Sequence, residues 1–316
     1  MRILILGCNS FFARASFSKL YKRENEILGI SRSTLHEEIK EKIQNNLKNE
    51  FRFYKLDFVK DFEMVTRKII LFRPQIIIDA LGEGLVNPSW AEPDKWIRTN
   101  VEYKIKLVRT LIETGEFPQK YIKISTPEVY GSFKGRVKEN RAHNPSTPYA
   151  VSHSTIDRLL YLYFKVNQFP SIFARFANFY GPRQQNYRII PLAINNALNL
   201  KPFPLEGDGK TFRTFIFKSD IAYAIESLIK HGNPGEVYHF GTDELISMKS
   251  LVTTIYKMVN PKHKVQFLEK PARVYSDLCY RLDCRFTTMR LGWKPKVELS
   301  KGLSITLDSM LSHNCR

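Results

Sequence analysis

The sequence predicts an α/β fold, a doubly wound parallel sheet with a smaller, partly interleaved C-terminal lobe. Aliphatic runs of strand length alternate with amphipathic segments through the first half of the chain. These runs are continuous and do not alternate with polar residues, which is typical of parallel strands covered on both faces. A length of 316 residues suggests about two domains, and the alternation fades after residue 180, where Pro and Gly become frequent.

Five segments are expected to be strands, because each is rich in aliphatic or aromatic residues. They are residues 2–7, 25–33, 51–57, 75–82 and 120–126. Three segments have apolar residues at helical spacing. They are residues 62–74, 93–117 and 149–164. Since strands and helices alternate, we expect the strands to be parallel, with helices on both faces of the sheet.

The composition excludes several classes of function. Hydrophobic residues make up 43% of the chain, yet no apolar run approaches the ~20 residues of a membrane span. Cys279 and Cys284 are five residues apart with no His nearby, so zinc spacing is absent and no metal is expected. We interpret them, with Cys8 and Cys315, as ordinary reduced thiols, and we expect a cytoplasmic protein.

The net charge of +18 also needs an interpretation. Lys and Arg are spread along the chain with acidic residues among them, so nucleic acid is not the expected partner. A Lys-rich solvated surface is the first interpretation. The second is an electric field that attracts an anionic small substrate.

The turn after the first expected strand is a candidate cofactor site. It reads GCNSFFA, and a dinucleotide site favours glycines here so that the backbone can approach the pyrophosphate at a helix N-terminus. Only Gly7 is present, with Ser10 and Ala13 at the later glycine positions. Small side chains still permit a close approach. The predicted cofactor contacts in this turn are Gly7, Asn9, Ser10 and Phe11.

The end of the second expected strand bears on the choice of cofactor. An acidic residue there would bind the ribose 2′-hydroxyl of NAD. This chain has Ser31, Arg32 and Ser33 instead, and a cation flanked by hydroxyls suits a 2′-phosphate. We therefore expect NADP, with NAD as the alternative. The other interpretation is an exposed polar turn that binds nothing.

A series of motifs resembles a known family. STPEVYG (125–131) and TPYAVSH (147–153) are similar to motifs of the extended short-chain dehydrogenase/reductases, and within them of the nucleotide-sugar dehydratases. The chain most resembles dTDP-glucose and GDP-mannose 4,6-dehydratases, with UDP-glucuronate decarboxylases nearby. Further matches cover nearly the whole chain: ALGEGLVNPSWAEP, WIRTN, NFYGPR, GDGKTFRTF, VYHFG and LGWKP.

The resemblance implies a Rossmann domain over residues 1–180, with later strands returning near 214–241, and a nucleotide-sugar-binding lobe over residues 181–316. It also implies a tightly held nicotinamide cofactor and a sugar bound through its nucleotide diphosphate. In such enzymes a Tyr takes the C4 hydroxyl proton while hydride leaves C4. A Glu then removes the acidic C5 proton, water leaves C6, and hydride returns to C6.

The resemblance assigns roles to residues of this chain. Tyr149 would be the base, Thr126 would hydrogen-bond the C4 oxygen, and Glu128 would take the C5 proton. Besides the residues of the two turns, the implied cofactor contacts are Asp57, Leu81, Gly82, Ser125, Tyr149 and His153. The implied substrate contacts are Glu83, Asn178 and Arg213, the last two at positions that hold the diphosphate.

Two residues depart from the family pattern. Pro127 stands where dTDP-glucose dehydratases have an Asp, the acid for the leaving water, and where the GDP-mannose enzymes and the decarboxylases have Ser. His153 stands where the family has a Lys that binds the nicotinamide ribose and lowers the pKa of Tyr149. Imidazole has an ordinary pKa of ~6.5, so we expect slower or more pH-dependent hydride chemistry.

Three functions follow from these residues. The first is a 4,6-dehydratase, the second a nucleotide-sugar 4-epimerase or C4 oxidoreductase, and the third a degenerate, non-catalytic nucleotide-sugar binder. Retention of Thr126, Glu128 and Tyr149 argues against the binder. The resemblance also implies a homodimer, formed by the helices expected over residues 93–113 and 149–167.

Overall fold

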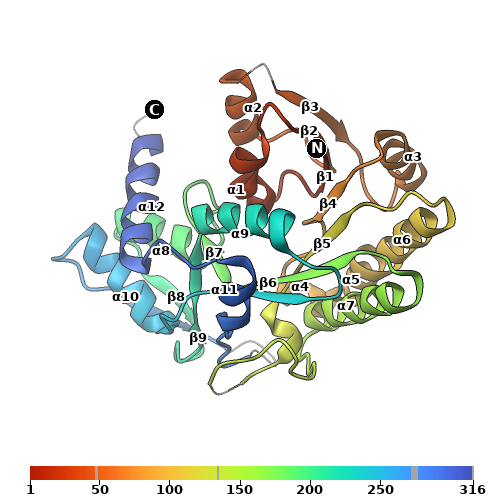
Figure 1. The fold of residues 1–316 in the computed structure, drawn as a ribbon. Helices are drawn as coiled ribbons and strands as arrows, with labels where there is room; N and C mark the ends of the chain where they lie inside the picture. The colour runs from red at the N-terminus through yellow and green to blue at the C-terminus, as the bar shows by residue number, and fades with distance from the viewer. Residues whose placement is uncertain (47–48, 134, 272–276, 315–316) are drawn as a thin grey trace.

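A seven-stranded parallel sheet forms the centre of the molecule (Figure 1). The computed structural model describes residues 1–46, 49–133, 135–271 and 277–314. The strand order is β11-β6-β5-β4-β1-β2-β3, which confirms the predicted doubly wound α/β fold. The strands are β1 (Arg2–Leu6), β2 (Glu26–Ser31), β3 (Glu50–Lys55), β4 (Ile76–Asp79), β5 (Lys120–Ser125), β6 (Ser171–Phe176) and β11 (Val237–Phe240).

Helices cover both faces of the sheet because its inner strands are apolar on both sides. In β1, Ile3 and Ile5 are buried in one core, whereas Leu4 and Leu6 are buried in the other. The helices of the first face are α1 (Phe11–Leu20), α2 (Glu37–Gln44), α9 (Lys218–His231) and α11 (Arg285–Leu291). Those of the second are α3 (Phe62–Phe72), α6 (Tyr103–Glu113) and α7 (Pro148–Asn167).

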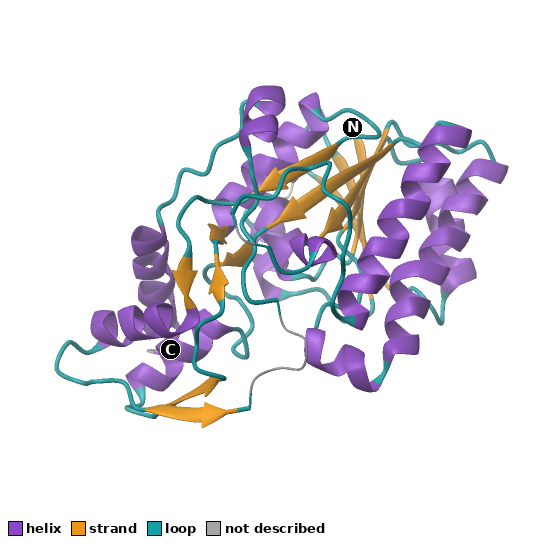
Figure 2. Cartoon of the chain, turned by 90° about the horizontal axis from the view of Figure 1, so that it is seen from below, coloured by secondary structure: helices purple, strands orange, loops and turns teal. Residues whose placement is uncertain are grey.

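A smaller lobe with its own core lies beside the sheet domain (Figure 2). Its helices are α8 (Ile189–Leu198), α10 (Met248–Val259) and α12 (Leu299–Asn314). Three two-stranded sheets accompany them: β7 (Asn178–Tyr180) with β10 (Phe215–Phe217), β8 (Phe203–Glu206) with β13 (Phe267–Lys270), and β9 (Phe212–Arg213) with β12 (Ile246–Ser247). The chain interleaves the two parts, because α9 and β11 return to the central sheet between segments of the lobe.

The segment expected as one long helix over residues 93–117 is interrupted. Two short helices, α4 (Val86–Ala91) and α5 (Pro93–Ile97), lead into a π-helical turn at Arg98–Glu102, and only then does α6 begin. Such turns widen a helix by one residue and often occur at functional sites. Here the π-helical turn contains Asn100, whose amide contacts the loop after β4.

Two other expectations concern the state of the cysteines and the presence of membrane-spanning helices. Cys8, Cys279 and Cys284 are all free thiols, and Cys315 lies outside the described residues. Within the described ranges, none of the helices combines the length and the apolar character that crossing a bilayer demands.

The candidate site lies where the strand order reverses. β1 is flanked by β2 on one side and β4 on the other, so the crossover connections leave β1 and β4 in opposite directions. In doubly wound sheets, ligands bind at the carboxyl ends of the strands at this point. Three predicted site residues lie at these strand ends: Gly7 after β1, Leu81 after β4 and Thr126 after β5.

Candidate active site

The turn after β1 brings two backbone segments into close contact. Gly7 has a φ of 74°, and a Cβ atom there would lie 2.6 Å from the carbonyl oxygen of Ala80. Only glycine therefore fits. Helix α1 begins at once, and the Ser10 hydroxyl caps it by accepting the Ala13 N–H at 3.2 Å. The free N–H groups of this helix end fit the pyrophosphate of a dinucleotide.

Asn9 connects this turn to the loop after β2. Its amide donates to the Ser33 hydroxyl and the Thr34 carbonyl at 2.8 Å each, and its oxygen accepts the His36 N–H at 3.0 Å. Asn9 therefore positions the Ser31–Ser33 segment beside the turn. The Phe11 ring is buried and stacks on Phe179 at 5.7 Å. Its side chain belongs to the packing, which leaves its backbone N–H for a ligand.

Arg32 and Glu83 form an ion pair at 2.7 Å. The guanidinium side chain is 63% exposed, so most of it remains accessible. The carboxylate predicted for the substrate thus lies beside residues predicted for the cofactor. Asp57 is close by: burial alone would raise its pKa, but the Lys60 and Val59 N–H groups and Arg32 lower it, so its carboxylate is ionised.

The loop after β4 is fixed by Asn100. The Glu83 N–H donates to Asn100 Oδ1 at 2.9 Å, and Asn100 Nδ2 donates to the Glu83 carbonyl at 3.1 Å and to Ser152 Oγ at 3.0 Å. A Cβ on Gly82 would lie 2.7 Å from Asn100 Oδ1. The sequence motif WIRTN contained this residue, but its bracing role depends on the π-helical turn and was not predicted.

The segment STPEVYG forms a short 3₁₀ turn at Pro127–Tyr130 after β5. Thr126 caps the turn, and its Oγ1 accepts the Glu128 N–H at 3.3 Å. Pro127 occupies the first position of the turn, where its missing N–H costs no hydrogen bond. The proline therefore preserves the backbone that presents Thr126 and Glu128.

Helix α7 begins with the same local arrangement. Thr147 caps it by accepting the Ala150 N–H at 3.1 Å, Pro148 is its first residue, and Tyr149 follows. The Tyr149 N–H also donates to Ser89 Oγ at 3.2 Å, which anchors the helix end to α4.

The Tyr149 hydroxyl lies among the predicted catalytic groups. Burial raises its pKa most, and the negative charge of Glu128 adds to this, whereas a hydrogen bond to Thr126 and the charge of Arg188 lower it. The structure therefore brings Thr126, Glu128 and Tyr149 together. Arg188, at the start of α8, was not among the predicted residues and is the cation that acts on Tyr149.

His153 lies one helical turn after Tyr149, with the two rings edge to face at 4.7 Å. The imidazole is 8% exposed. Burial, followed by the charges of Lys123, Lys104 and Arg175, pushes its pKa well below the ordinary value. Burial and these charges thus favour the neutral imidazole. A more pH-dependent hydride step stays a prediction.

Ser125 belongs to a buried polar network behind the site. Its Oγ donates to Asp157 at 2.7 Å, and Asp157 pairs with Arg175 at 3.1 Å. Arg175 in turn contacts the hydroxyl of Tyr130, the tyrosine of the EVYG sequence. Ser125 therefore fixes the end of β5, and its predicted contact with the cofactor stays a prediction.

Tyr280 connects the predicted substrate residues. Its hydroxyl donates to Asn178 Oδ1 at 3.0 Å, and the Arg213 guanidinium lies over its ring at 4.2 Å. Glu128 and Tyr149 both contribute to raising its pKa, after burial. Tyr280 thus links the lobe to the catalytic groups. It was missed because its segment carries no motif in the sequence.

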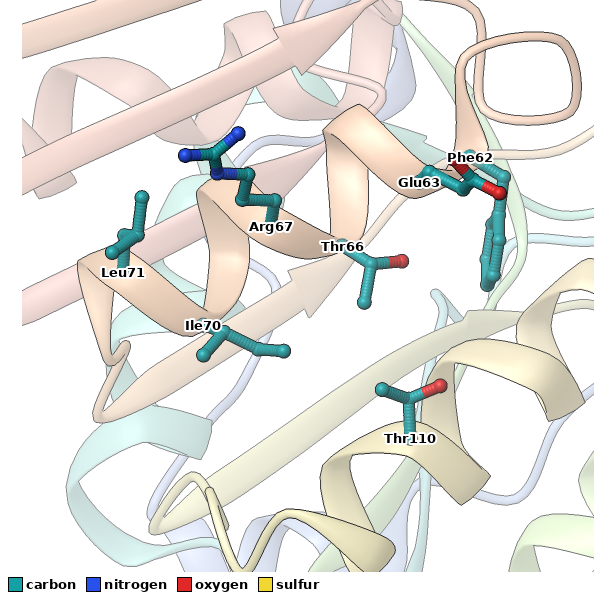
Figure 3. A pocket seen from close by; sticks show the side chains of 7 residues that line it. All are labelled: Phe62, Glu63, Thr66, Arg67, Ile70, Leu71 and Thr110. Atoms are coloured by element: carbon teal, nitrogen blue, oxygen red, sulfur yellow. The ribbon is translucent and has the colours of Figure 1, made fainter.

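A surface groove elsewhere does not compete with this site. The groove lies between α3 and α6, lined by α3 from Phe62 to Leu71 and by Thr110 (Figure 3). It contains none of the predicted site residues and is mostly apolar.

Comparisons with known proteins agree with this geometry. Residues 3–241 match the NAD dependent epimerase/dehydratase family. A protein of Sinorhizobium fredii named "Probable dTDP-glucose 4,6-dehydratase" is 26% identical over 332 residues, covering 99% of this chain and 93% of the relative.

Two solved structures resemble the chain over nearly its whole length. The dTDP-glucose 4,6-dehydratase of Bacillus anthracis in complex with NAD has a TM-score of 0.86 at 25% identity, covering 99% of this chain and 97% of the other. The UDP-glucose 4-epimerase of Thermotoga maritima with UDP-glucose has a TM-score of 0.88 at 24% identity, covering 99% and 100%. The second likeness shows the fold alone.

The close approach at Gly7 makes a prediction about stability. Gly7→Ala places a Cβ against the Ala80 carbonyl and forces alanine to a positive φ, so we expect a loss of at least ~2 kcal/mol in the free energy of unfolding. Gly84→Ala is the matched control, because a Cβ there meets nothing within 4 Å. Denaturant unfolding of both variants measures the difference. Equal midpoints would refute the prediction.

Proposed function

Because the chain belongs to the NAD-dependent epimerase/dehydratase family, we propose that it is a nucleotide-sugar 4,6-dehydratase. The observation that carries the proposal is the position of Glu128 in the turn that Thr126 caps, beside the Tyr149 hydroxyl that Thr126 hydrogen-bonds. A 4-epimerase needs a base for the C4 hydroxyl only. A dehydratase also needs a base for the C5 proton, and we assign this role to Glu128.

Each proton step is assigned to one residue of the chain. Tyr149 takes the proton of the C4 hydroxyl, and the hydroxyl of Thr126 hydrogen-bonds the C4 oxygen as it becomes a ketone. A bound nicotinamide would supply the hydride chemistry at C4 and C6. Glu128 takes the C5 proton, which the C4 ketone has made acidic, and the C6–O bond then breaks.

The leaving oxygen must gain a proton to depart as water. Pro127 carries no proton at the position where dTDP-glucose dehydratases have an acid. The proton that Glu128 has taken from C5 is available to the C6 oxygen. One carboxyl group thereby serves as base and then as acid. A proton from solvent must then reach C5 when hydride returns to C6, and the product is a 4-keto-6-deoxy sugar.

The lobe supplies the contacts for the nucleotide diphosphate. Arg213 is held by the Asp277 carbonyl at 2.7 Å and by stacking on Tyr280, which pre-orients its guanidinium for a phosphate. Asn178, fixed by Tyr280, lies on the same side. The relative from Sinorhizobium fredii makes dTDP-glucose the first substrate to test, with UDP- and GDP-sugars next.

The role of Glu128 is tested by deuterium exchange. Glu128→Gln keeps the shape and loses the proton acceptor, so we expect C4 oxidation to persist while C5 exchange falls at least ~100-fold. The enzyme is incubated with each sugar in deuterated water. Absorbance of reduced cofactor at 340 nm reports C4 oxidation, and NMR reports deuterium at C5 and C6.

Controls separate the steps and the alternative functions. Tyr149→Phe is expected to abolish both signals, because it removes the first base. Deuterium at C5 of a 6-deoxy product supports dehydration, whereas an unaltered C6 hydroxyl indicates epimerisation or simple oxidation. If Glu128→Gln incorporates deuterium as fast as the unaltered protein, Glu128 is not the base.

The cofactor is the second part of the proposal. The family is NAD-dependent, and for this chain we propose a preference for NADP(H), conferred by Arg32 between Ser31 and Ser33. Arg32→Ala is expected to weaken NADP binding about tenfold with little effect on NAD. Glu83→Gln, which frees Arg32 from its ion pair, is expected to strengthen NADP binding. Calorimetry measures both; equal affinities of the unaltered protein for the two cofactors would overturn the preference.

Assembly is the third part, and we propose a homodimer through α5, α6 and α7. Three apolar side chains on α5 and α7 are exposed to solvent: Ile97 at 42%, Leu162 at 57% and Val166 at 78%. Leu162→Glu is expected to give monomers, because it places a charge in an apolar interface. Met289→Glu on α11, where the side chain is 73% exposed, is the control. Light scattering at micromolar concentration measures the molar mass of each protein. A monomeric unaltered protein would refute the proposal.

A further inference from the structure

A buried group of charged side chains lies beneath His153 and takes no part in the proton steps above. It consists of Asp79, Lys104, Tyr121 and Lys123, called here the lysine cluster, and none of these residues is more than 1% exposed. Such groups are rarely buried so deeply unless they are paired. The arrangement of their charges therefore needs a reason.

Lys104 and Asp79 neutralise each other. The Lys104 ammonium lies 2.7 and 2.6 Å from the two Asp79 oxygens and 2.6 Å from the Leu81 carbonyl. Burial lowers its pKa to about 7 against the attraction of Asp79. The neighbouring Lys123 lowers this pKa further, whereas the three acceptors around the Lys104 nitrogen favour the charged ammonium with its three N–H donors. Tyr121 also donates to Asp79, at 2.9 Å.

Lys123 leaves the cluster with an excess of positive charge. Its Nζ is 3.9 Å from Asp79 and donates to the Ile124 carbonyl at 2.6 Å. Two lysines thus lie against one carboxylate, so basic groups outnumber acidic ones in this buried cluster. Side chains alternate along a strand, so Lys123 shares the face of Ser125, which bonds to Asp157 of α7. Lys123 thus lies on the side of the sheet that α7 covers.

The charges of this cluster act on His153 of α7, next to Tyr149. Its Nδ1 is buried and has no hydrogen-bond partner among the residues that the structure describes. The charges that act on the ring come from Lys123 of β5, Lys104 of α6 and Arg175 of β6, and all are positive. Tyr149 contacts it from the same helix. The ring is therefore a neutral hydrogen-bonding group next to a fixed cation.

We propose that Lys123 and His153 together replace the single lysine that the family resemblance expects at position 153. Lys123 supplies the positive charge from within the sheet, and neutral His153 presents a ring nitrogen to the ribose of the cofactor. Both act as positioning residues, and the inference rests on the proposed function. A lysine at position 153 itself would bring a third ammonium beside one carboxylate.

A charge exchange between the two positions tests the proposal. Lys123→Met removes the buried charge that acts on His153, and we expect the affinity for the cofactor, and with it the rate of C4 oxidation at low cofactor concentration, to fall about tenfold. His153→Lys alone is expected to lower both stability and rate, because three ammonium groups then crowd the site. The double variant Lys123→Met/His153→Lys restores one cation at the family position and is expected to recover most of the rate.

Two measurements do not depend on the sugar. Calorimetric binding of NAD and NADP is expected to weaken in Lys123→Met and to recover in the double variant. In NMR of protein labelled at the histidine Cε1, His153 is expected to stay neutral to pH 5 in the unaltered protein and to gain a higher pKa in Lys123→Met. Removing a neighbouring cation makes protonation easier, which a purely structural role of Lys123 would not require.

The control is Lys120→Met, on the same strand, whose ammonium bonds to carbonyls of α9 at 2.6 and 3.3 Å. It is expected to leave cofactor affinity and the pKa of His153 unchanged. If the double variant binds cofactor no better than Lys123→Met, or if the pKa of His153 does not move, the inference is wrong. If no sugar turns over but these two results hold, the proposed reaction fails while the inference stands.

Discussion

The buried ion pair between Asp79 and Lys104 is the interaction on which the candidate site depends. It ties the end of β4 to the start of α6, and the third N–H of Lys104 holds the Leu81 carbonyl. The backbone after β4 is thereby fixed where it crosses Gly7. Burying such a pair stabilises a fold little, but removing one partner costs about 3–5 kcal/mol. The pair therefore specifies a geometry more than it adds stability.

Short-range capping positions the catalytic groups on this frame. Thr126 and Thr147 each cap a turn that begins with proline, and the residues that follow include Glu128 and Tyr149. A hydroxyl at the cap and a fixed φ at the next position define where both segments start. Two helical elements from different parts of the chain thus meet at the carboxyl end of β5 with little freedom to move.

The departures from the family pattern are compatible with a working site. Pro127 fits the first position of its turn, and His153 fits beneath Tyr149 because cations from β5 and α6 lie nearby. In this chain the positive charge and the hydrogen bond to the cofactor come from two separate elements, although a single lysine could provide both. A comparison of motifs at single positions interprets His153 as the loss of a positive charge. The residues around His153 include Lys123, a positively charged side chain from strand β5.

The sequence by itself determined the α/β class and the doubly wound sheet, because strand burial is a local pattern, and the family resemblance of its motifs implied the grouping of Thr126, Glu128 and Tyr149. It did not determine the π-helical turn that aims Asn100, the reach of Tyr280 to Asn178, or the partners of Lys104 and Lys123. These depend on residues from distant elements meeting in space. A buried lysine and a solvated one look alike in a sequence, since only the neighbours that tertiary packing brings decide their charge and their role.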